Sequence, residues 1–506
     1  MPFYLNCLCD LAPLRLCVKI FVSMENLSNE QPNLDVLILA AGLGTRMRSN
    51  QAKVLHRLDG RPLINHVCRA ATALAPRKVY VVIGHQGEDV KRAVLEEMDA
   101  NHVEFVWQNE QLGTGHAVNS ARRFLENEDS ILMVLSGDVP MIRAGTLAGI
   151  VRQHQTHRGR GAAGTLLTVK MDDPTGYGRI VRDDAGLFHK IVEQKDATGD
   201  EKKIREINAG IYCFNTKKLF SALSRVKNEN AQGEYYLTDV PELLRADGED
   251  VAIYAHSDAH EIEGINNRVQ LADMERVLRH RIVRRLMLDY GVSFINPQAA
   301  YISEQASIGR DTIIYPNVTI EGASEIGDGC TIRSGVRITN SRIGHGVEIL
   351  ENSVIVDSEI SNSCTVGPMA HLRGHAKMEE SAKVGNFVEL KKTILGRGSK
   401  ASHLTYLGDA TIGEKTNIGA GTVTCNYDGK NKHATTIGNN VKIGSDTMLV
   451  APVKVGDGAV TAAGSVVTKD VPPDTLVAGV PAVVKKNLKE SEKDSISAQT
   501  DQPSEK

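Results

Sequence analysis

The stretch "SIGRDTIIYPNVTIEGASEIGDGCTIRSGVRI", Ser307–Ile338, carries an isoleucine at every sixth position. An α-helix repeats about every 3.6 residues and a strand about every 2, so neither explains this spacing. A triangular prism does, because each hexad forms one short strand and a turn, and three hexads complete one coil. The spacing therefore predicts a hexapeptide-repeat parallel β-helix, with the recurring aliphatic side chains stacked inside it.

The six-residue period continues beyond this stretch, with one skip and one interruption. Hexads such as "IGDGCT" and "VGDGAV" place glycine beside the aliphatic residue, where the chain turns a corner. The segment "TCNYDGKNKHAT", residues 424–435, breaks the period and is predicted to be an inserted loop. The aliphatic positions are Ile308, Ile314, Ile320, Ile326, Ile332, Ile338, Ile343, Ile349, Val354, Ile360, Val366, Leu372, Met378, Val384, Leu390, Ile437, Ile443, Leu449 and Val455.

The N-terminal half alternates short aliphatic runs with helical stretches, which predicts a mostly parallel α/β sheet of the Rossmann-like kind covered by helices. The expected strands are Val36–Ala41, Val79–Ile83, Ile131–Leu135, Thr165–Val169 and Ile211–Phe214, and the expected helices are Pro62–Ala73, Gly115–Phe124 and Leu147–His154. Between the halves, apolar residues at helical spacing predict one long helix. They are Val269, Met274, Val277, Leu278, Ile282 and Leu286, and the opposite, basic face carries Arg279, Arg281, Arg284 and Arg285, which we expect to be solvated.

These patterns divide the chain of 506 residues into five parts. Lys plus Arg (59) nearly balances Asp plus Glu (62), which gives no basis for a nucleic-acid-binding surface. No segment approaches the roughly 20 apolar residues of a membrane span, and the eight cysteines form no metal or redox motif, so we expect a cytosolic protein with reduced thiols. The expected parts are an extension or mis-set start (1–32), an α/β domain (33–261), a linker helix (262–292), the β-helix (293–484) and a disordered tail (485–506).

A phosphate site is predicted at "VLILAAGLGTRMRSNQAKVLHRLDG", Val36–Gly60, where a buried strand meets a glycine turn. Backbone N–H groups in such a turn attract anions, and Arg46 and Lys53 supply two cations just beyond it. The turn is neither a Walker loop nor a dinucleotide-binding motif, because no GK[ST] follows and Met47 stands at the third glycine position. Asp138 ends the strand of "ILMVLSGDVP" and is either a turn former or, as a hard oxygen donor, a ligand of the kind that Mg²⁺ takes. Asn266 could be a second oxygen ligand, although from the sequence alone a helix cap is the more usual role.

A second site is predicted among polar residues that interrupt the hexads. His403 is the candidate proton acceptor, because the pKa of a free imidazole lies near working pH. Cationic and amide side chains around it could hold a phosphorylated sugar. A β-helix can equally be a spacer or an assembly rod, so the fold alone leaves an enzyme, a nucleotidyltransferase with a purely structural β-helix, and a non-enzymatic scaffold open.

An ordered series of motifs narrows these possibilities. "LAAGLGTRM", "QNEQLGTGHA", "SGDVP", "DPTGYGRI", "IVEQKDA", "NAGIY", "NAQGEYYLTD", "EGINNR" and the stretch around "SKASHLTYLGDA" resemble, in this order, the bifunctional bacterial N-acetylglucosamine-1-phosphate uridyltransferase/glucosamine-1-phosphate acetyltransferase family. The resemblance covers more than four-fifths of the chain. It implies that the β-helix is left-handed and that the protein makes UDP-N-acetylglucosamine for peptidoglycan and lipopolysaccharide.

For the N-terminal domain the resemblance implies transfer of UMP from UTP to N-acetylglucosamine-1-phosphate, with Mg²⁺ held by Asp138 and Asn266. Arg46 and Lys53 would act on the phosphates, Gln108, Gly113 and Thr114 would bind uracil, and Gly178, Glu193 and Asn208 would bind the sugar. The other implied substrate-binding residues are Leu39, Ala40, Ala41, Gly42, Gly44, Ser136 and Gly137.

For the β-helix the resemblance implies acetylation of glucosamine-1-phosphate by acetyl-CoA, with His403 as general base and a homotrimer that places acetyl sites between subunits. Lys432 would reach from the inserted loop to a neighbouring subunit. The implied ligand-binding residues are Arg373, Lys391, Tyr406, Asn417, Asn426, Tyr427 and Lys432 for the sugar phosphate, and Ala420, Ser445 and Ala463 for coenzyme A.

The chain departs from the family pattern at four places. Leu43 replaces a frequent lysine, Ser136 a tyrosine and Ala52 a proline, and these changes bear on nucleotide affinity more than on reaction type. An arginine near coenzyme A is absent, and Lys485 or Lys486 is its expected substitute.

Overall fold

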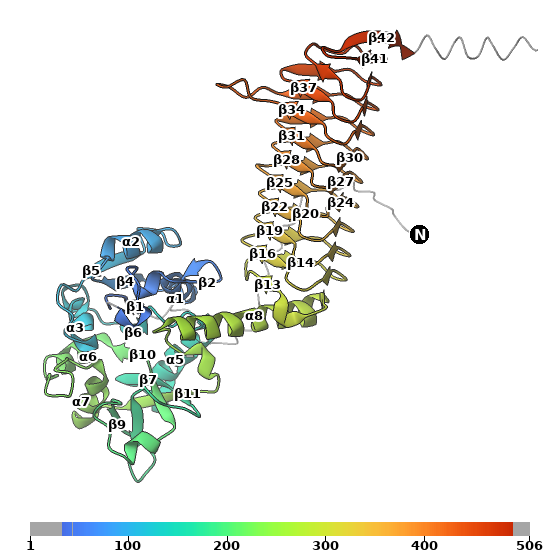
Figure 1. Cartoon of the computed structure of the whole chain (residues 1–506). Coiled ribbons are helices and arrows are strands. Elements are labelled where there is room, and N and C mark those ends of the chain that lie inside the picture. The colour runs from blue at the N-terminus through green and yellow to red at the C-terminus, as the bar shows by residue number, and fades with distance from the viewer. Residues whose placement is uncertain (1–32, 43, 489–506) are drawn as a thin grey trace, which may run out of the picture.

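The computed structural model describes residues 33–42 and 44–488. The predictions for residues 1–32, Leu43 and the tail beyond residue 488 lie outside these residues. An N-terminal α/β domain is followed by helix α8 (Arg268–Tyr290), which lies across the base of a long prism of short strands (Figure 1). Among the described residues, no helix is both long and apolar enough to cross a bilayer.

The N-terminal sheet is mostly parallel, as predicted. Strands β1, β4, β5 and β6 run in one direction, and β10 is antiparallel to both of its neighbours. Sequence patterns missed β5, β11 and the β8–β9 hairpin. The strand order is β11 (Val251–His256), β7 (Gly164–Lys170), β10 (Glu206–Asn215), β6 (Ile131–Ser136), β1 (Leu34–Leu39), β4 (Lys78–Ile83), β5 (Val103–Trp107), with β8 (Arg179–Arg182) and β9 (Phe188–Val192) attached to β10.

Helices cover both faces of this sheet, and each face has its own apolar cluster. Along β1, Val36 and Ile38 face one cluster while Leu37 faces the other, so the central strands are apolar on both sides. The helix expected over Gly115–Phe124 is two short helices. The helices are α1 (Leu63–Thr72), α2 (Gly87–Leu95), α3 (Thr114–Asn119), α4 (Arg122–Leu125), α5 (Ala144–Thr156), α6 (Thr216–Leu223) and α7 (Val240–Ala246).

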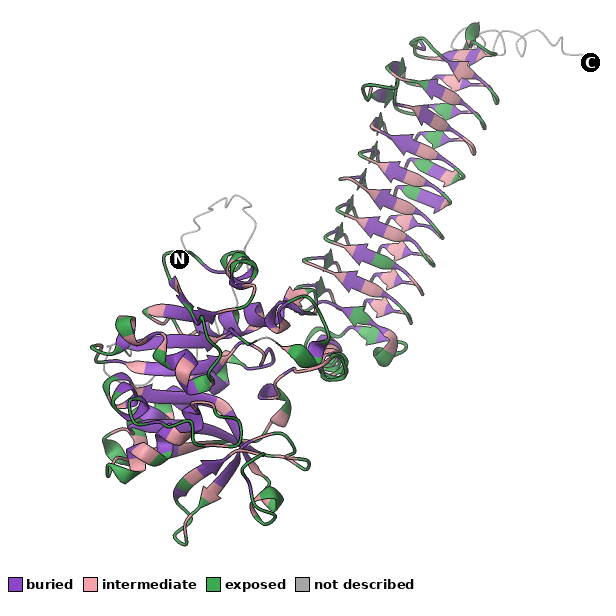
Figure 2. Ribbon diagram, turned by 60° about the vertical axis from the view of Figure 1, so that its left-hand side comes forward, coloured by how far each residue is buried: buried purple, intermediate pink, exposed green. Residues whose placement is uncertain are grey.

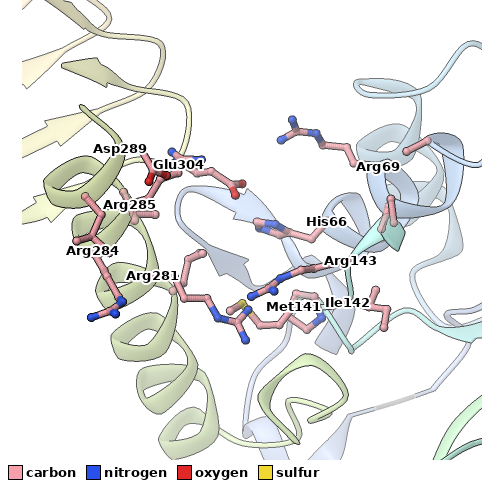
Figure 3. A pocket seen from close by; sticks show the side chains of 17 residues that line it. His66, Arg69, Met141, Ile142, Arg143, Arg281, Arg284, Arg285, Asp289 and Glu304 are labelled. Atoms are coloured by element: carbon pink, nitrogen blue, oxygen red, sulfur yellow. The ribbon is translucent and has the colours of Figure 1, made fainter. Parts of the chain in front are cut away.

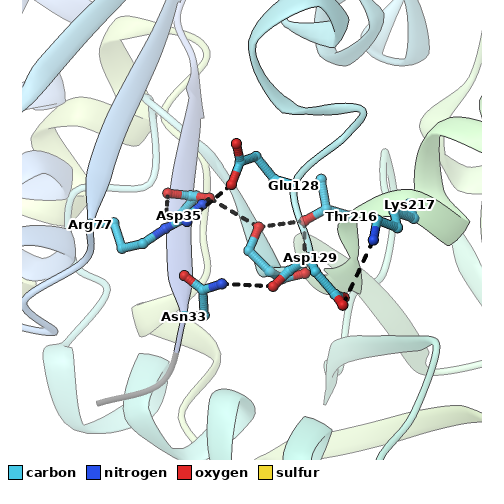
Figure 4. Close-up of polar contacts among 8 residues, drawn as sticks. Asn33, Asp35, Arg77, Glu128, Asp129, Thr216 and Lys217 are labelled. Carbon is cyan, nitrogen blue, oxygen red and sulfur yellow. Dashed lines mark hydrogen bonds and ion pairs between the residues drawn. The ribbon is translucent and has the colours of Figure 1, made fainter. Parts of the chain in front are cut away.

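A polar network ties the amino ends of the central strands together (Figure 4). The carboxylate of Asp35, which is only 1% exposed, accepts hydrogen bonds from Arg77 and from the Ser130 hydroxyl at 3.0 Å. Arg77 also donates to Glu128 at 3.0 Å, and its bond to Asp35 raises the pKa of its guanidinium. This buried charge is therefore compensated, and the opposite, carboxyl edge of the sheet remains available for a ligand.

Helix α8 begins at the capping side chain of Asn267, which accepts a hydrogen bond from the Gln270 N–H at 2.9 Å. Gly291 ends it at a φ of 68°, in the left-handed region. The predicted apolar face is confirmed at Met274, Leu278, Ile282 and Leu286, which are buried. The prediction was wrong for Val269, which is 72% exposed because it precedes Leu278 by about two and a half helical turns and therefore lies on the opposite side of the helix.

The predicted solvated basic face of α8 is only partly right. Arg281 donates to Asp258 at 2.8 Å, and Arg279 lies over the Tyr301 ring at 4.5 Å. The face therefore holds the linker helix to the N-terminal domain and to the first coil of the prism.

The prism has three sheets of 12, 10 and 9 strands between β12 (Ser293–Phe294) and β42 (Val483–Asn487). Neighbouring coils pair in parallel, and Figure 2 shows that buried residues recur in the strands along the length of the prism. Every predicted stacking position is buried except Val354, where the neighbouring Ile355 faces inward. The prediction missed by one residue because some coils are one residue shorter than three full hexads, as the partners Ile338 and Ile355 in adjacent coils show.

The ends and the interruption of the prism differ in part from expectation. The inserted loop is confirmed; it leaves the prism after β34 (Val423–Cys425) and is closed by an antiparallel bridge between Tyr427 and Lys432. The boundary expected after residue 484 is wrong, because β42 continues to Asn487 and pairs antiparallel with β41 (Thr475–Ala478). Lys485 and Lys486 are thus exposed residues of a strand.

If inward stacking stabilises the prism, Ile332→Ala should lower the free energy of unfolding by about 2–5 kcal/mol, because Ile332 is fully buried and its truncation leaves a cavity. The midpoint of urea-induced unfolding measures the loss. Ile394→Ala, at a prism position that is 37% exposed, is the matched control. Equal shifts in the two variants would contradict inward stacking.

Candidate functional sites

The glycine turn after β1 packs directly against the segment that carries Lys53. Gly44 has a φ of 61°, and a Cβ at this position would lie 2.5 Å from the Lys53 Cβ. Gly42 has open space around it instead. Glycine at position 44 is therefore required both by its backbone conformation and by close approach, and this contact sets the position of Lys53 relative to the turn.

Four of the predicted residues converge at the carboxyl edge of the sheet. The Lys53 ammonium forms an ion pair with Asp138 and donates to the Asn266 Oδ1 at 3.1 Å. Arg46 donates to the same Asn266 oxygen at 2.9 Å. The side chains of Lys53 and Asp138 are 17% and 16% exposed, so the pair remains accessible to a ligand. The expected meeting of two cations with two oxygen ligands is present.

The backbone fixes this arrangement. β1 and β6 are adjacent with Leu39 opposite Ser136, so the glycine turn and Asp138 leave the sheet side by side. The Gly137 N–H donates to the Leu39 carbonyl at 2.9 Å, and the Ile265 N–H donates to the Asp138 carbonyl at 2.9 Å. The backbone next to the charged groups is therefore that of the two strand ends and the turns after them, namely Leu39, Ala40, Ala41, Ser136 and Gly137.

The oxygens of Asp138 and Asn266 suit a magnesium ion bound together with a nucleotide. Both already face one cation, the Lys53 ammonium. Within the described residues no group of three or more His, Cys, Asp or Glu side chains could hold a metal. Mg²⁺ is commonly bound by one or two protein oxygens, with phosphates and water completing its shell, so the two-oxygen donor set fits such an ion.

The residues expected to bind uracil surround a close backbone contact. Gln108 is buried and its amide lies 3.1 Å from His116 Nδ1. Gly113 has a φ of 105°, and a Cβ there would lie 2.6 Å from the Tyr235 carbonyl oxygen. The Thr114 hydroxyl accepts from the Leu237 N–H at 3.1 Å. The polar groups are thus held in place, and His116 is a residue of this region that sequence patterns did not single out.

The three residues expected to bind the sugar also lie together. The Asn208 N–H donates to the Gly178 carbonyl at 2.9 Å, and a Cβ on Gly178 would lie 3.4 Å from a Glu193 oxygen. Burial raises the pKa of Glu193, while a hydrogen bond from Thr238 opposes that rise. Sequence patterns missed Tyr177, whose pKa burial raises to about 12 and whose hydroxyl bonds to the Gly264 backbone.

His403 has a specific polar partner on the preceding coil. β30 (Lys400–His403) pairs with β27 (Lys383–Asn386), and this register sets Asn386 beside His403. The Asn386 Oδ1 lies 2.6 Å from His403 Nδ1. An amide oxygen accepts a hydrogen bond, so Nδ1 carries the proton and Nε2 is the basic nitrogen. His403 itself is exposed. Asn386 was missed, although one coil spacing before His403 would have indicated it.

The three small residues expected to line coenzyme A lie along the same corner of the prism as His403. Ala401 pairs with Ile418, and Ile418 with Ile443, so Ala420 and Ser445 stand in successive coils beyond His403. The Asp446 N–H donates to the Ala420 carbonyl at 2.7 Å and the Gly464 N–H to the Ser445 carbonyl at 2.8 Å. Ala463 completes this column of small side chains, which leaves room for an extended ligand beside the histidine.

The predicted cations lie along the neighbouring sheet. Arg373 and Lys391 are ladder partners, and Arg373 donates to Glu389 at 2.7 Å. The Lys391 ammonium lowers the pKa of Lys432, which indicates that Lys432 lies close to Lys391 of its own chain. The expected reach of Lys432 to another subunit stays a prediction. Two ammonium groups this close repel each other, and an anion bound between them would relieve that repulsion.

The remaining predicted residues differ in how close they lie to His403. Asn426 donates to Asp409 at 2.5 Å, and the Tyr406 hydroxyl would lie 2.5 Å from a Cβ on Gly408, so both lie over the same strand. Tyr427 is 61% exposed and donates to the Gly429 carbonyl of its own loop at 2.7 Å. Asn417 pairs with Lys400, at the far end of these strands from His403. The single chain therefore does not bring Tyr427 and Asn417 to His403.

Comparison with known protein families agrees with both halves. A nucleotidyl transferase family model matches residues 35–259. A GMPPB C-terminal domain model matches residues 296–378, and a bacterial transferase hexapeptide model of six repeats matches residues 434–469. These matches confirm the predicted fold class, in which a nucleotidyltransferase domain is joined to a left-handed parallel β-helix.

Individual relatives match over almost their full length. A Bifunctional protein GlmU of Heliobacterium modesticaldum is 51% identical over 440 residues, 87% of this chain and 94% of the relative. Those of Syntrophomonas wolfei and Pelobacter propionicus are 48% and 49% identical, over 88% of this chain and 96% and 95% of their own lengths. The chain is therefore an enzyme with two transferase domains, and it belongs to the family of bifunctional GlmU proteins.

Proposed function

We propose that the prism acetylates glucosamine-1-phosphate with acetyl-CoA and that the N-terminal domain then transfers UMP from UTP to the resulting N-acetylglucosamine-1-phosphate. The observation that carries the uridylyl assignment is the convergence of Arg46, Lys53, Asp138 and Asn266 at the sheet edge. A test supplies glucosamine-1-phosphate, acetyl-CoA, UTP and Mg²⁺ together and follows both free thiol and pyrophosphate.

In uridylyl transfer, a phosphate oxygen of the sugar attacks the α-phosphorus of UTP in line, and pyrophosphate leaves. No protein nucleophile is required, so catalysis consists of positioning and charge neutralisation. Lys53 and Arg46 would neutralise charge on the phosphates, and Gly44 would let the backbone approach them. A magnesium ion held by Asp138 and Asn266 would supply further charge stabilisation when bound.

In acetyl transfer, the sugar amine attacks the thioester carbonyl and coenzyme A leaves as the thiol. The Nε2 atom of His403 would take the proton from the amine, and Asn386 would keep the ring in the tautomer that exposes this nitrogen. Lys391 and Lys432 would hold the sugar phosphate, while Ala420, Ser445 and Ala463 would flank coenzyme A.

A nucleotidyltransferase with a purely structural prism is the second candidate. It explains the N-terminal site equally well, but gives no role to the His403–Asn386 pair or to the two adjacent lysines. We further propose that the chain acts as a cytosolic homotrimer, since the proposed substrates are cytosolic metabolites. In a trimer, a neighbouring subunit would supply the groups that Tyr427 and Asn417 do not supply within one chain.

Lys53→Ala should lower the rate of uridylyl transfer by about 100-fold or more, because it removes a cation from the developing phosphate charge. Acetyl transfer should be unchanged. Pyrophosphate and thiol release, measured on the same preparation, separate the two activities. Lys78→Ala, at a partly exposed lysine paired with Glu104, is the control; loss of both activities in Lys53→Ala would indicate misfolding.

Removal of divalent cations by EDTA should stop uridylyl transfer and leave acetyl transfer running, because the proposed uridylyl transfer uses a Mg²⁺ ion held by Asp138 and Asn266, whereas the proposed acetyl transfer uses no metal ion. Both rates are followed before and after chelation, and added Mg²⁺ should restore the first. Uridylyl transfer that persists in EDTA would refute a role for Asp138 and Asn266 as metal ligands.

His403→Ala should lower acetyl transfer by about 100- to 10,000-fold, the usual contribution of a general base, with uridylyl transfer intact. His345→Ala is the matched control, since His345 is also an exposed prism histidine but lies toward the base. A thiol-release assay gives the rates, and a fully active His403→Ala enzyme would remove this histidine from the mechanism.

A further inference from the structure

A cavity of about 720 Å³ lies between part of α8 and the N-terminal domain, and the proposed reactions do not use it (Figure 3). Its volume lies in the range of small-molecule sites. Buried apolar residues from three segments contribute to its wall, among them Met141, Ile142 and Ile282. The cavity therefore offers apolar surface as well as depth.

The polar lining of this cavity is dominated by arginine. Figure 3 shows Arg69, His66 and Arg143 on the side of the N-terminal domain and Arg281 on the facing helix. The lining arginines are Arg69, Arg143, Arg281, Arg284 and Arg285, and the lining acids are Asp289 and Glu304.

Two of these arginines are neutralised from behind the lining. Arg143 pairs with Glu261 at 3.2 Å and Arg281 with Asp258 at 2.8 Å. Burial, and then the nearby charge of Arg143, lower the pKa of Arg281. A further anion at this point would relieve the repulsion between the two guanidinium groups.

The other three arginines are exposed and, within the described part of the chain, Arg69, Arg284 and Arg285 form no ion pair. The carboxylates of Asp289 and Glu304 line the same cavity and likewise form no ion pair among the described residues. Guanidinium groups suit phosphate oxygens in geometry and charge. The lining thus combines unpaired phosphate-binding groups with an apolar surface.

The walls of the cavity continue the segments that carry the first site. Pro140–Ala144 follows Asp138 almost directly, and α8 starts two residues after Asn266. Helix α1 follows the segment that begins at Lys53. A ligand in this cavity would contact the segments that follow Lys53, Asp138 and Asn266 without occupying the uridylyl site itself.

We propose that this cavity binds a small molecule with a ring or other apolar part and at least two phosphate groups, at a site separate from the nucleotide site. The proposal does not depend on the two reactions proposed above. The ring would lie on the apolar wall, and the phosphates would pair with the arginines.

Calorimetric titration of the full chain with ADP at low salt tests the proposal. Arg69→Gln/Arg285→Gln should bind ADP at least about tenfold more weakly than the unaltered protein, because two charge-assisted contacts are lost. The control Arg92→Gln/Arg276→Gln removes the same charge from exposed arginines that pair with Asp89 and Asp273 outside the cavity, and it should bind as the unaltered protein does. Adenosine, which lacks phosphates, should not bind.

Equal ADP affinity in all three proteins, or no ADP binding to the unaltered protein, would overturn the proposal. Thermal unfolding and the uridylyl and acetyl transfer rates are measured on each variant. Since neither Arg69 nor Arg285 belongs to the two proposed sites, these rates should be unchanged, which separates failure of this inference from failure of the proposed function.

Discussion

One aliphatic side chain per short strand must face the axis of the prism, and the second half of the structure depends on this packing. Each inward residue packs on its counterparts in the coils above and below, about 4.8 Å away. A slipped residue would turn the apolar side chain outward. Because the register is fixed in this way, Asn386, His403 and Ala420 stand in one column, and the geometry of the proposed acetyl site is a consequence of core packing.

In the N-terminal domain the comparable constraint is burial of the central strands on both faces. β1 and β6 must lie parallel and adjacent, and this brings the glycine turn and Asp138 to one edge. At the opposite edge the charged side chains pair with one another, as Arg77 does with Asp35. At the carboxyl edge, where the helix-covered sheet is open to a ligand, Lys53 and Asp138 form a pair whose side chains remain 17% and 16% exposed.

The prism was predictable because its sequence repeats, and the errors occurred where the repeat changes length. Val354 was assigned to the interior in place of Ile355 because the coils lose a residue at that point. Lys53 and Asp138 were predictable from local patterns, since Asp138 follows the end of β6 and Lys53 is a cation a short way beyond the glycine turn. The partnership of His403 with Asn386 joins different coils, so the coil spacing of 17 residues indicates it and no shorter pattern does. The pairing of Arg281 with Asp258 depends on docking of two separate segments, which no sequence pattern shows.

The two halves are joined by an apolar core that is continuous through α8. One hydrophobic cluster contains Met141 beside the first site, Leu278 and Ile282 on the helix, and Phe294 in the first strand of the prism. A flexible linker would let the halves move independently, whereas this cluster fixes the helix to both. The arginine-lined cavity opens along the same contact. Any ligand that displaces α8 there must also disturb packing next to Asp138, so the linker helix is a route by which an event outside the reacting centres can act on the uridylyl site.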